Sequence, residues 1–191
     1  MFEEFKRYLL TKGQFTTANL ARIKAISRMV NVNKGDLILK TDDIWHYNAF
    51  VSSGLFRTYW IDNMGGEHII SFAHRNYWVG DRESLLSGRP TLLNIQALED
   101  SALVMIDQKD FHSLSKEIEP FNQMMVNLIQ ANIAFTKGRI SANMSVSDLD
   151  KYKNFIKKFE AVAGRIPHHM IASYLQMDPA TLTRIIESRK K

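Results

Sequence analysis

The segment His168–Ile185, HHMIASYLQMDPATLTRI, has the pattern of two short helices that cross at a fixed angle. Such a helix-turn-helix needs buried apolar residues at set positions and a small residue where the helices touch. Ala172 supplies the small contact, and Asp178-Pro179 supplies an N-cap followed by proline at the first helical position. The apolar positions are Ile171, Leu175, Met177, Leu182 and Ile185. The segment predicts a helix-turn-helix, and a helical hairpin that only packs is the alternative.

Gln176 departs from this pattern, because glycine is usual at the tight turn between the helices. A left-handed non-glycine residue costs about 1–2 kcal/mol, which a fold can accommodate. We expect the second helix to enter a DNA major groove, with Arg184 making a bidentate contact to guanine and Ser188 and Arg189 contacting phosphates. The predicted DNA-binding residues are Pro179, Ala180, Thr181, Thr183, Arg184, Ser188 and Arg189.

Basic residues concentrate in the same part of the chain. Residues 148–191 contain 9 Lys+Arg and 5 Asp+Glu, a balance of +4, whereas residues 1–147 contain 16 and 15, a balance of +1. The excess favours an anionic partner for the C-terminal segment, nucleic acid before membrane. A tail that only increases solubility is the alternative reading of the charge.

The composition limits the class of protein. The chain has 191 residues, of which 45% are hydrophobic, so it can form one domain or two small ones around a true core. It has no cysteine, which excludes disulfides, thiolate zinc sites and iron–sulfur clusters within the chain. The start, MFEEFKRYLL, is not a secretory signal, and no apolar run is long enough to cross a membrane. We therefore expect a cytoplasmic protein.

Upstream of residue 107 the periodicity changes from helix to strand. Residues 1–30 have helical spacing, and beyond Val30 short runs of β-branched and aromatic residues alternate with turns. The expected strands are Asp36–Lys40, Ala49–Val51, Leu55–Ile61, Glu67–Phe72, Leu92–Leu98 and Ala102–Ile106. Their regular spacing predicts an antiparallel sandwich or jelly roll, in which the third and fourth strands form a hairpin across Gly65-Gly66.

A long amphipathic helix follows Pro120. At 1.5 Å per residue it extends about 35 Å, which is longer than the barrel beside it. A second molecule would cover the remainder in a coiled-coil-like dimer, with Asn132 setting the register; a helix packed wholly on its own barrel is the alternative. The predicted dimer-helix residues are Phe121, Met124, Met125, Leu128, Ala131, Asn132 and Phe135.

A polar break at Ser145–Asp148 separates this helix from the next, expected over Leu149–Ala163. We therefore predict an α+β protein in three parts. Residues 1–119 form a jelly-roll barrel with flanking helices, residues 120–146 form the dimerisation helix, and residues 147–191 form a helical helix-turn-helix domain.

The order of barrel, long helix and helix-turn-helix resembles the Crp/Fnr family of transcription regulators. The resemblance rests on Lys34-Gly35-Asp36, Phe50–Arg57, Val79–Pro90, Ala97-Leu98-Glu99 and Ile166–Ile185. It implies a homodimer on palindromic double-stranded DNA, in which a cyclic nucleotide-binding-type barrel controls the two recognition helices through the long helix. RNA polymerase is a further candidate partner. Without cysteine, the iron–sulfur branch of the family is excluded.

One cassette departs from the family's pattern. In members that bind cyclic nucleotides, a Gly-Glu pair and a downstream Arg-Ser pair hold the ribose and the phosphate; here Gly80-Asp81 resembles the first pair, but Thr91-Leu92 fall where the second is expected. Losing the arginine removes an interaction of about 1.5–3 kcal/mol, so we expect no tight binding of cyclic AMP. The pocket is either open to another effector or filled by neighbouring side chains. The candidate pocket residues are Gly80, Asp81, Glu83, Ser84, Arg89, Thr91 and Leu92.

Two functions other than transcription regulation make different demands on the sequence. A cupin-like metal enzyme needs two histidines alternating on one strand, but no His-x-His occurs, and His46, His68 and His74 are spread over separate segments. The chain has no Gly-rich phosphate loop or nucleophile elbow either. We predict no metal site, no cofactor and no catalytic residues. A sensor module that does not bind DNA is the second rival, and it predicts loss of the exposed Arg184 face.

Overall fold

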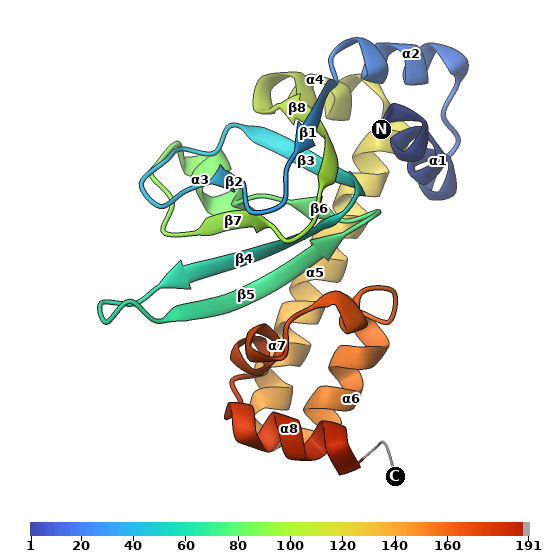
Figure 1. Cartoon of the computed structure of the whole chain (residues 1–191). Coiled ribbons are helices and arrows are strands. Elements are labelled where there is room, and N and C mark those ends of the chain that lie inside the picture. The colour runs from blue at the N-terminus through green and yellow to red at the C-terminus, as the bar shows by residue number, and fades with distance from the viewer. Residues whose placement is uncertain (189–191) are drawn as a thin grey trace. The chain divides into compact units, whose positions relative to one another are not determined.

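The computed structural model describes the backbone of residues 1–188 and their side chains, except those of residue 132 and residues 134–145 (Figure 1). The chain divides into two compact units: Met1–Trp60 with Ser71–Ile129, and Ile61–Ile70 with the chain from Gln130 onward. The first unit contains all the strands except the tip of one hairpin, together with the helices that precede residue 119. The second unit contains that tip, the C-terminal half of a long helix and the helices after it.

The elements of the first unit follow the expected order of helices, then strands, then helix. They are α1 (Phe2–Lys12), α2 (Thr17–Ala25), β1 (Arg28–Val32), β2 (Leu37–Leu39), β3 (Tyr47–Ser53), β4 (Leu55–Ile61), β5 (Glu67–His74), β6 (Trp78–Val79), α3 (Arg82–Ser87), β7 (Asn94–Ala97), β8 (Ser101–Asp107) and α4 (Gln108–Glu117). The long helix α5 (Glu119–Ser145) begins one residue before the predicted Pro120 and crosses from the first unit into the second.

The strands form two four-stranded sheets, in the orders β1-β8-β3-β6 and β2-β7-β4-β5. All pairs with a determined register are antiparallel, as predicted. The two sheets are not joined edge to edge by any ladder among the described strands. The strands therefore form two open antiparallel sheets that pack around a shared core, as expected for a sandwich or jelly roll, and the barrel is not closed.

The core between the sheets explains why these strands form. Val51 pairs with Leu103 in one sheet and Phe56 pairs with Ala97 in the other, and all four side chains are buried in one cluster. Alternating side chains on each strand point to opposite faces, so each strand supplies this cluster from every second position. Trp45, at 4% exposure, packs into the same cluster from a loop.

A second core lies between the N-terminal helices, the β1-β8-β3-β6 sheet and the first half of α5. Phe5 of α1, Phe50 of β3 and Trp78 of β6 form its aromatic centre, with ring centroids 4.8–5.6 Å apart. Phe121, the first apolar residue of the predicted helix stripe, is fully buried in this core. The N-terminal part of α5 is therefore held by its own unit.

Helical periodicity was misleading near residue 30. Residues 28–30, expected to continue the second helix, lie in β1, where Arg28 pairs with Met105 and Val32 with Ser101. Pairing with β8 overrides the local helical spacing, because it satisfies the backbone hydrogen bonds of both strands. The short strand β6 and the helix α3 were also not predicted.

The helices of the second unit pack on one another, coloured orange to red in Figure 1. They are α6 (Asp148–Lys158), the 3₁₀ turn η1 (Ala163–Arg165), α7 (His168–Leu175) and α8 (Pro179–Ser188). Helix α6 starts where expected, capped by Ser147, but ends five residues before the predicted Ala163. The chain turns after Phe159 because this buried side chain joins Phe155 and Tyr174 in an aromatic cluster, with centroids 4.9–5.7 Å apart.

Candidate nucleic-acid interface and effector cassette

A tight turn joins α7 to α8. Gln176 has φ 52° and ψ 47°, which confirms the left-handed conformation predicted for it, and the following Met177 N–H donates to the Ala172 carbonyl over 2.9 Å. The carboxylate of Asp178 accepts from the N–H groups of Ala180 and Thr181, at 2.9 and 3.1 Å. Asp178 is thus the predicted N-cap of α8, and Pro179 is its first residue.

Apolar residues of both helices bury the contact between them. Ala172 is 1% exposed and allows close approach, while Leu182 of α8 is also 1% exposed. The other predicted apolar positions Ile171, Leu175 and Met177 are buried, and Ile185 is half-buried. Helix α6 contacts both α7 and α8, so the pair rests on a third helix.

The opposite face of α8 is turned to solvent. Pro179, Ala180, Thr183, Arg184 and Ser188 are exposed and Thr181 is half-buried. The guanidinium of Arg184 donates to the Thr181 hydroxyl over 3.1 Å, which extends the arginine along the exposed side of the helix. Arg189, the last predicted DNA-binding residue, lies outside the described residues.

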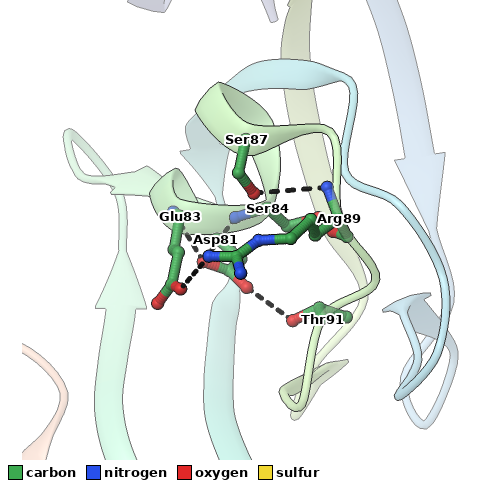
Figure 2. Close-up of polar contacts among 6 residues, drawn as sticks. All are labelled: Asp81, Glu83, Ser84, Ser87, Arg89 and Thr91. Carbon is green, nitrogen blue, oxygen red and sulfur yellow. Dashed lines mark hydrogen bonds and ion pairs between the residues drawn. The ribbon is translucent and has the colours of Figure 1, made fainter.

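The predicted effector cassette surrounds α3. Asp81 caps this helix by accepting from the N–H groups of Glu83 and Ser84, at 2.9 and 3.3 Å. Its second carboxylate oxygen accepts from the hydroxyl of Thr91 over 2.5 Å, as Figure 2 shows. Ser84 donates to the Arg89 carbonyl over 2.7 Å and accepts from the backbone N–H of Trp45 over 3.0 Å. The structure therefore brings Asp81, Ser84 and Thr91 together.

The side chains of the remaining cassette residues do not join this network. Glu83 and Arg89 form an exposed ion pair, 3.3 Å apart, with side chains 81% and 74% exposed, and Leu92 is 75% exposed. Gly80, with φ 150°, lies against the indole of Trp45, and a β-carbon there would overlap the ring nitrogen. A tryptophan side chain thus occupies the space beside Gly80.

Contacts from a distant loop complete the cassette, and sequence analysis missed them. The backbone of Thr91 pairs with the loop before β3, where its N–H donates to the Asp43 carbonyl and its carbonyl accepts from Asp42, at 2.8 and 2.9 Å. Asp42 has φ 73°, a left-handed conformation. About fifty positions of chain separate the two loops, so no local pattern links them. The Asp42-Asp43 doublet is the only turn signal that the loop offers.

The predicted dimer-helix residues fall into three groups. Phe121 and Met124 are 0% and 1% exposed in the core of their own unit, and Met125 and Leu128 pack partly against it. These side chains therefore stabilise their own fold, because α1 and α4 cover this face of the helix. Ala131 is exposed, whereas the side chains of Asn132 and Phe135 lie outside the described residues.

A groove runs beside this helix, with a volume of about 210 Å³. Leu86 and Val126, at 61% and 39% exposure, contribute apolar surface to it, and Asn48 and Gln108 bond to each other over 2.8 Å at its wall. Its apolar lining comes from α3, α4 and α5: Leu85, Leu86, Phe111, Met125, Val126 and Ile129. Ile133, one helical turn beyond, is 51% exposed.

The histidines weighed as metal ligands have other surroundings. His68 bonds to Asp62 over 2.7 Å, and His74 packs on the ring of Tyr77 with centroids 4.3 Å apart. Within the part of the chain that the structure describes, no three His, Asp or Glu side chains are grouped to hold a metal ion. Among the same residues, no helix is long and apolar enough to span a membrane.

Part of the chain resembles a known protein family in sequence. Residues 29–117 match the family described as cyclic nucleotide-binding domain. No curated protein sequence matches the chain.

Solved structures resemble it over most of its length. FixK2 from Bradyrhizobium japonicum has a TM-score of 0.72 at 15% identity, covering 85% of this chain and 84% of that one. A protein described as a Crp/Fnr-family regulator from Eubacterium rectale has 0.66 at 20%, covering 92% and 84%. The catabolite activator protein of Thermus thermophilus has 0.60 at 16%, covering 95% and 85%. The chain therefore contains a region similar to the cyclic nucleotide-binding domain and shares its fold with Crp/Fnr regulators.

Proposed function

We propose that this chain is a sequence-specific DNA-binding transcription regulator that acts as a homodimer on a palindromic site. In this proposal residues 147–191 bind DNA, residues 120–146 dimerise and residues 1–119 sense an effector. The observation that carries it is the α7–α8 pair, whose apolar side is buried while Ala180, Thr183 and Arg184 form an exposed face at the start of α8. An exposed arginine beside small side chains at the start of a helix is the arrangement that reads base edges in a major groove.

Arg184 is the residue proposed to read sequence. Its planar guanidinium can donate two hydrogen bonds to the O6 and N7 acceptors of guanine, a contact worth about 1–3 kcal/mol of discrimination. Ala180 and Thr183 are small enough to approach thymine methyl groups. The Thr181 hydroxyl, 3.1 Å from the guanidinium, holds the arginine extended in the free protein and so lowers the entropy lost on binding.

Selection of bound duplexes from a random pool tests this assignment. The wild-type protein should enrich a palindrome, and Arg184→Ala should lose guanine preference at one position of each half-site. Arg184→Lys keeps the charge but not the fork of donors, so it should also lose that preference. Lys153→Ala serves as the matched control, since this exposed cation lies on α6, pairs with Asp150 and is not among the residues proposed to read bases. No enriched palindrome, or the same enrichment with Arg184→Ala, would contradict the proposal and favour a sensor module without DNA binding.

The proposed dimer forms along α5. Ile133 is 51% exposed on this helix, and the neighbouring groove supplies apolar surface next to Val126. In aqueous solution, apolar side chains at helical spacing are shielded from solvent when two such helices pair. Sedimentation should therefore find a dimer for the wild type and a monomer for Ile133→Asp. Leu10→Asp, a change at a 48% exposed leucine on α1, should remain a dimer. A dimer unaffected by Ile133→Asp would contradict the α5 interface.

The effector is proposed not to be cyclic AMP. The Thr91 hydroxyl donates to the Asp81 carboxylate, the Ser84 hydroxyl bonds to backbone groups of Arg89 and Trp45, and the Arg89 guanidinium pairs with Glu83 at the surface. A cyclic phosphate would have to displace these bonds without a buried arginine to replace them. Calorimetry should therefore detect no micromolar binding of cyclic AMP, and micromolar binding would overturn this part of the proposal.

A further inference from the structure

A serine on α7 contacts the tip of the β4–β5 hairpin within the second unit. The hydroxyl of Ser173 accepts from the backbone N–H of Ile69 over 3.0 Å and donates to the backbone carbonyl of Glu67 over 3.2 Å. More than a hundred positions of chain separate the partners. Ser173 is half-buried and Ile69 is 7% exposed, so solvent competes little for the bond to Ile69, whereas the bond to Glu67 is exposed.

The geometry of β5 explains why one hydroxyl can fill this position. Residues i and i+2 of a strand present their hydrogen-bonding groups to the same side, so the Glu67 carbonyl and the Ile69 N–H flank one slot on an edge of the strand. β5 is the edge strand of its sheet. A hydroxyl has one donor and two acceptor sites. Ser173 can therefore bond to both the carbonyl and the N–H of this slot, as the backbone of a neighbouring strand would.

The hairpin tip has hydrogen bonds of its own, independent of α7. Asp62 accepts from the N–H groups of Met64 and Gly66, both at 2.8 Å, and its other carboxylate oxygen bonds to His68 over 2.7 Å. These bonds fix the turn from within. Docking on such a tip therefore restricts the orientation of α7 rather than ordering a loose loop.

Docking leaves the proposed reading face free. Ala172 and Tyr174, on either side of Ser173, are buried against the other helices, while Ser173 faces the hairpin. Ala180, Thr183 and Arg184 of α8 stay exposed in the docked arrangement. The contact is thus compatible with DNA binding and does not block it.

We propose that Ser173 is a positioning residue: it ties α7, and through the α7–α8 packing the reading helix, to the β4–β5 hairpin. This inference rests on the proposed function for its effect on DNA, but not for the contact itself. The two reading helices of a dimer must bind both half-sites simultaneously, which requires a fixed orientation of each helix. Loss of that orientation should therefore weaken binding to the palindrome more than binding to a single half-site.

Hydrogen exchange and DNA binding on the full chain test the inference together. Ser173→Ala removes both hydrogen bonds to the hairpin and should raise amide exchange at least about tenfold in residues 67–70 and 168–175, whereas Ser173→Thr should restore protection. On the palindrome that the wild type enriches, Ser173→Ala should bind about tenfold more weakly, with less than about a twofold change on a single half-site. Ser113→Ala, whose hydroxyl bonds only within α4 to Lys109 over 3.2 Å, is the matched control.

The outcomes separate the contact from the function. Unchanged exchange in Ser173→Ala would overturn the docking contact. Raised exchange with equal losses on palindrome and half-site would show a purely structural role and overturn positioning. If the wild type enriches no DNA, the proposed function fails and positioning falls with it, while exchange still decides whether Ser173 holds the hairpin.

Discussion

Two helices of this molecule begin with the same capping chemistry and differ in what surrounds it. Asp81 and Asp178 each accept two backbone N–H bonds at the start of a helix, α3 and α8 respectively. Near Asp81 the buried Thr91 and Ser84 hydroxyls are hydrogen-bonded, Thr91 to the Asp81 carboxylate and Ser84 to backbone groups. Near Asp178 the polar side chains of Thr183 and Arg184 are exposed. The same local signal therefore marks a closed cassette in one region and an open face in the other, and only the surroundings distinguish a structural cap from part of a binding surface.

The largest effect is expected where the cassette is tightest. Gly80→Ala combines a backbone conformation that L side chains rarely adopt with overlap against Trp45, and should destabilise the first unit by about 4 kcal/mol. Gly88→Ala is the matched control, because φ is 67° there and nothing lies near the added carbon, so only about 1–2 kcal/mol is lost. Urea unfolding followed by tryptophan fluorescence measures this, since all three tryptophans lie in the first unit. Equal losses would show that Trp45 does not fill the space.

The two caps should differ in energy when each is removed. Asp81→Ala loses two cap bonds and also leaves the buried hydroxyl of Thr91 without its acceptor, which should cost about 3 kcal/mol. Asp178→Ala loses only a solvent-exposed cap and should cost about 1 kcal/mol. Tryptophan fluorescence reports the first change and far-ultraviolet circular dichroism the second. Similar costs would mean that the closed cassette adds nothing to the cap.

A milder change isolates the bond that closes the cassette. Thr91→Val keeps the shape of this 2%-exposed side chain but removes the donor to Asp81, so we expect a loss of about 2 kcal/mol by urea unfolding. Ser87→Ala, an exposed neighbour that accepts only from the Arg89 N–H, should change stability by less than about 0.5 kcal/mol. An unchanged free energy of unfolding in Thr91→Val would mean that the cassette opens readily, and the cassette would again be a candidate ligand site.

The smallest effect concerns the hairpin tip. Hydrogen bonds from His68 first, and then from the N–H groups of Gly66 and Met64, hold the pKa of Asp62 below its ordinary value. Because the pKa of Asp62 is lower in the folded state, its ionised carboxylate stabilises the tip fully at pH values above the ordinary carboxyl pKa. This stabilisation is lost as the pH falls from the ordinary pKa to the lowered pKa. The amide resonances of Met64 and Gly66 should therefore shift as pH is lowered below about 4. Asp62→Asn should abolish the titration, and a titration that persists in this variant would assign it to another group.

Local signals predicted the C-terminal helices well. The Asp178-Pro179 start of α8, the left-handed Gln176 and the buried positions of both helices follow from capping, chain stiffness and 3.6-residue spacing, all of which act over a few residues. The β4–β5 hairpin was also predicted from the sequence, because strand alternation and a Gly-Gly turn are local signals. The roles proposed for the exposed α8 residues remain predictions.

Pairing over long distances could not be predicted in the same way. Residues 28–30 have helical spacing but lie in β1, because their partner strand β8 lies about seventy positions away, and α6 ends early because Phe159 turns into a cluster with Tyr174. The order of the strands within the two open sheets results from which strand edges meet, and periodicity does not contain that information.

The sequence by itself therefore determined the helix pair, the hairpin and the concentration of positive charge at the C-terminal end, since each depends on neighbours in the chain. Only the tertiary structure decided that the cassette is closed by Thr91 on Asp81 and that Ser173 meets the hairpin. Both contacts join segments distant in sequence, and their hydrogen bonds form only after the cores of the two units have brought those segments within about 3 Å of each other.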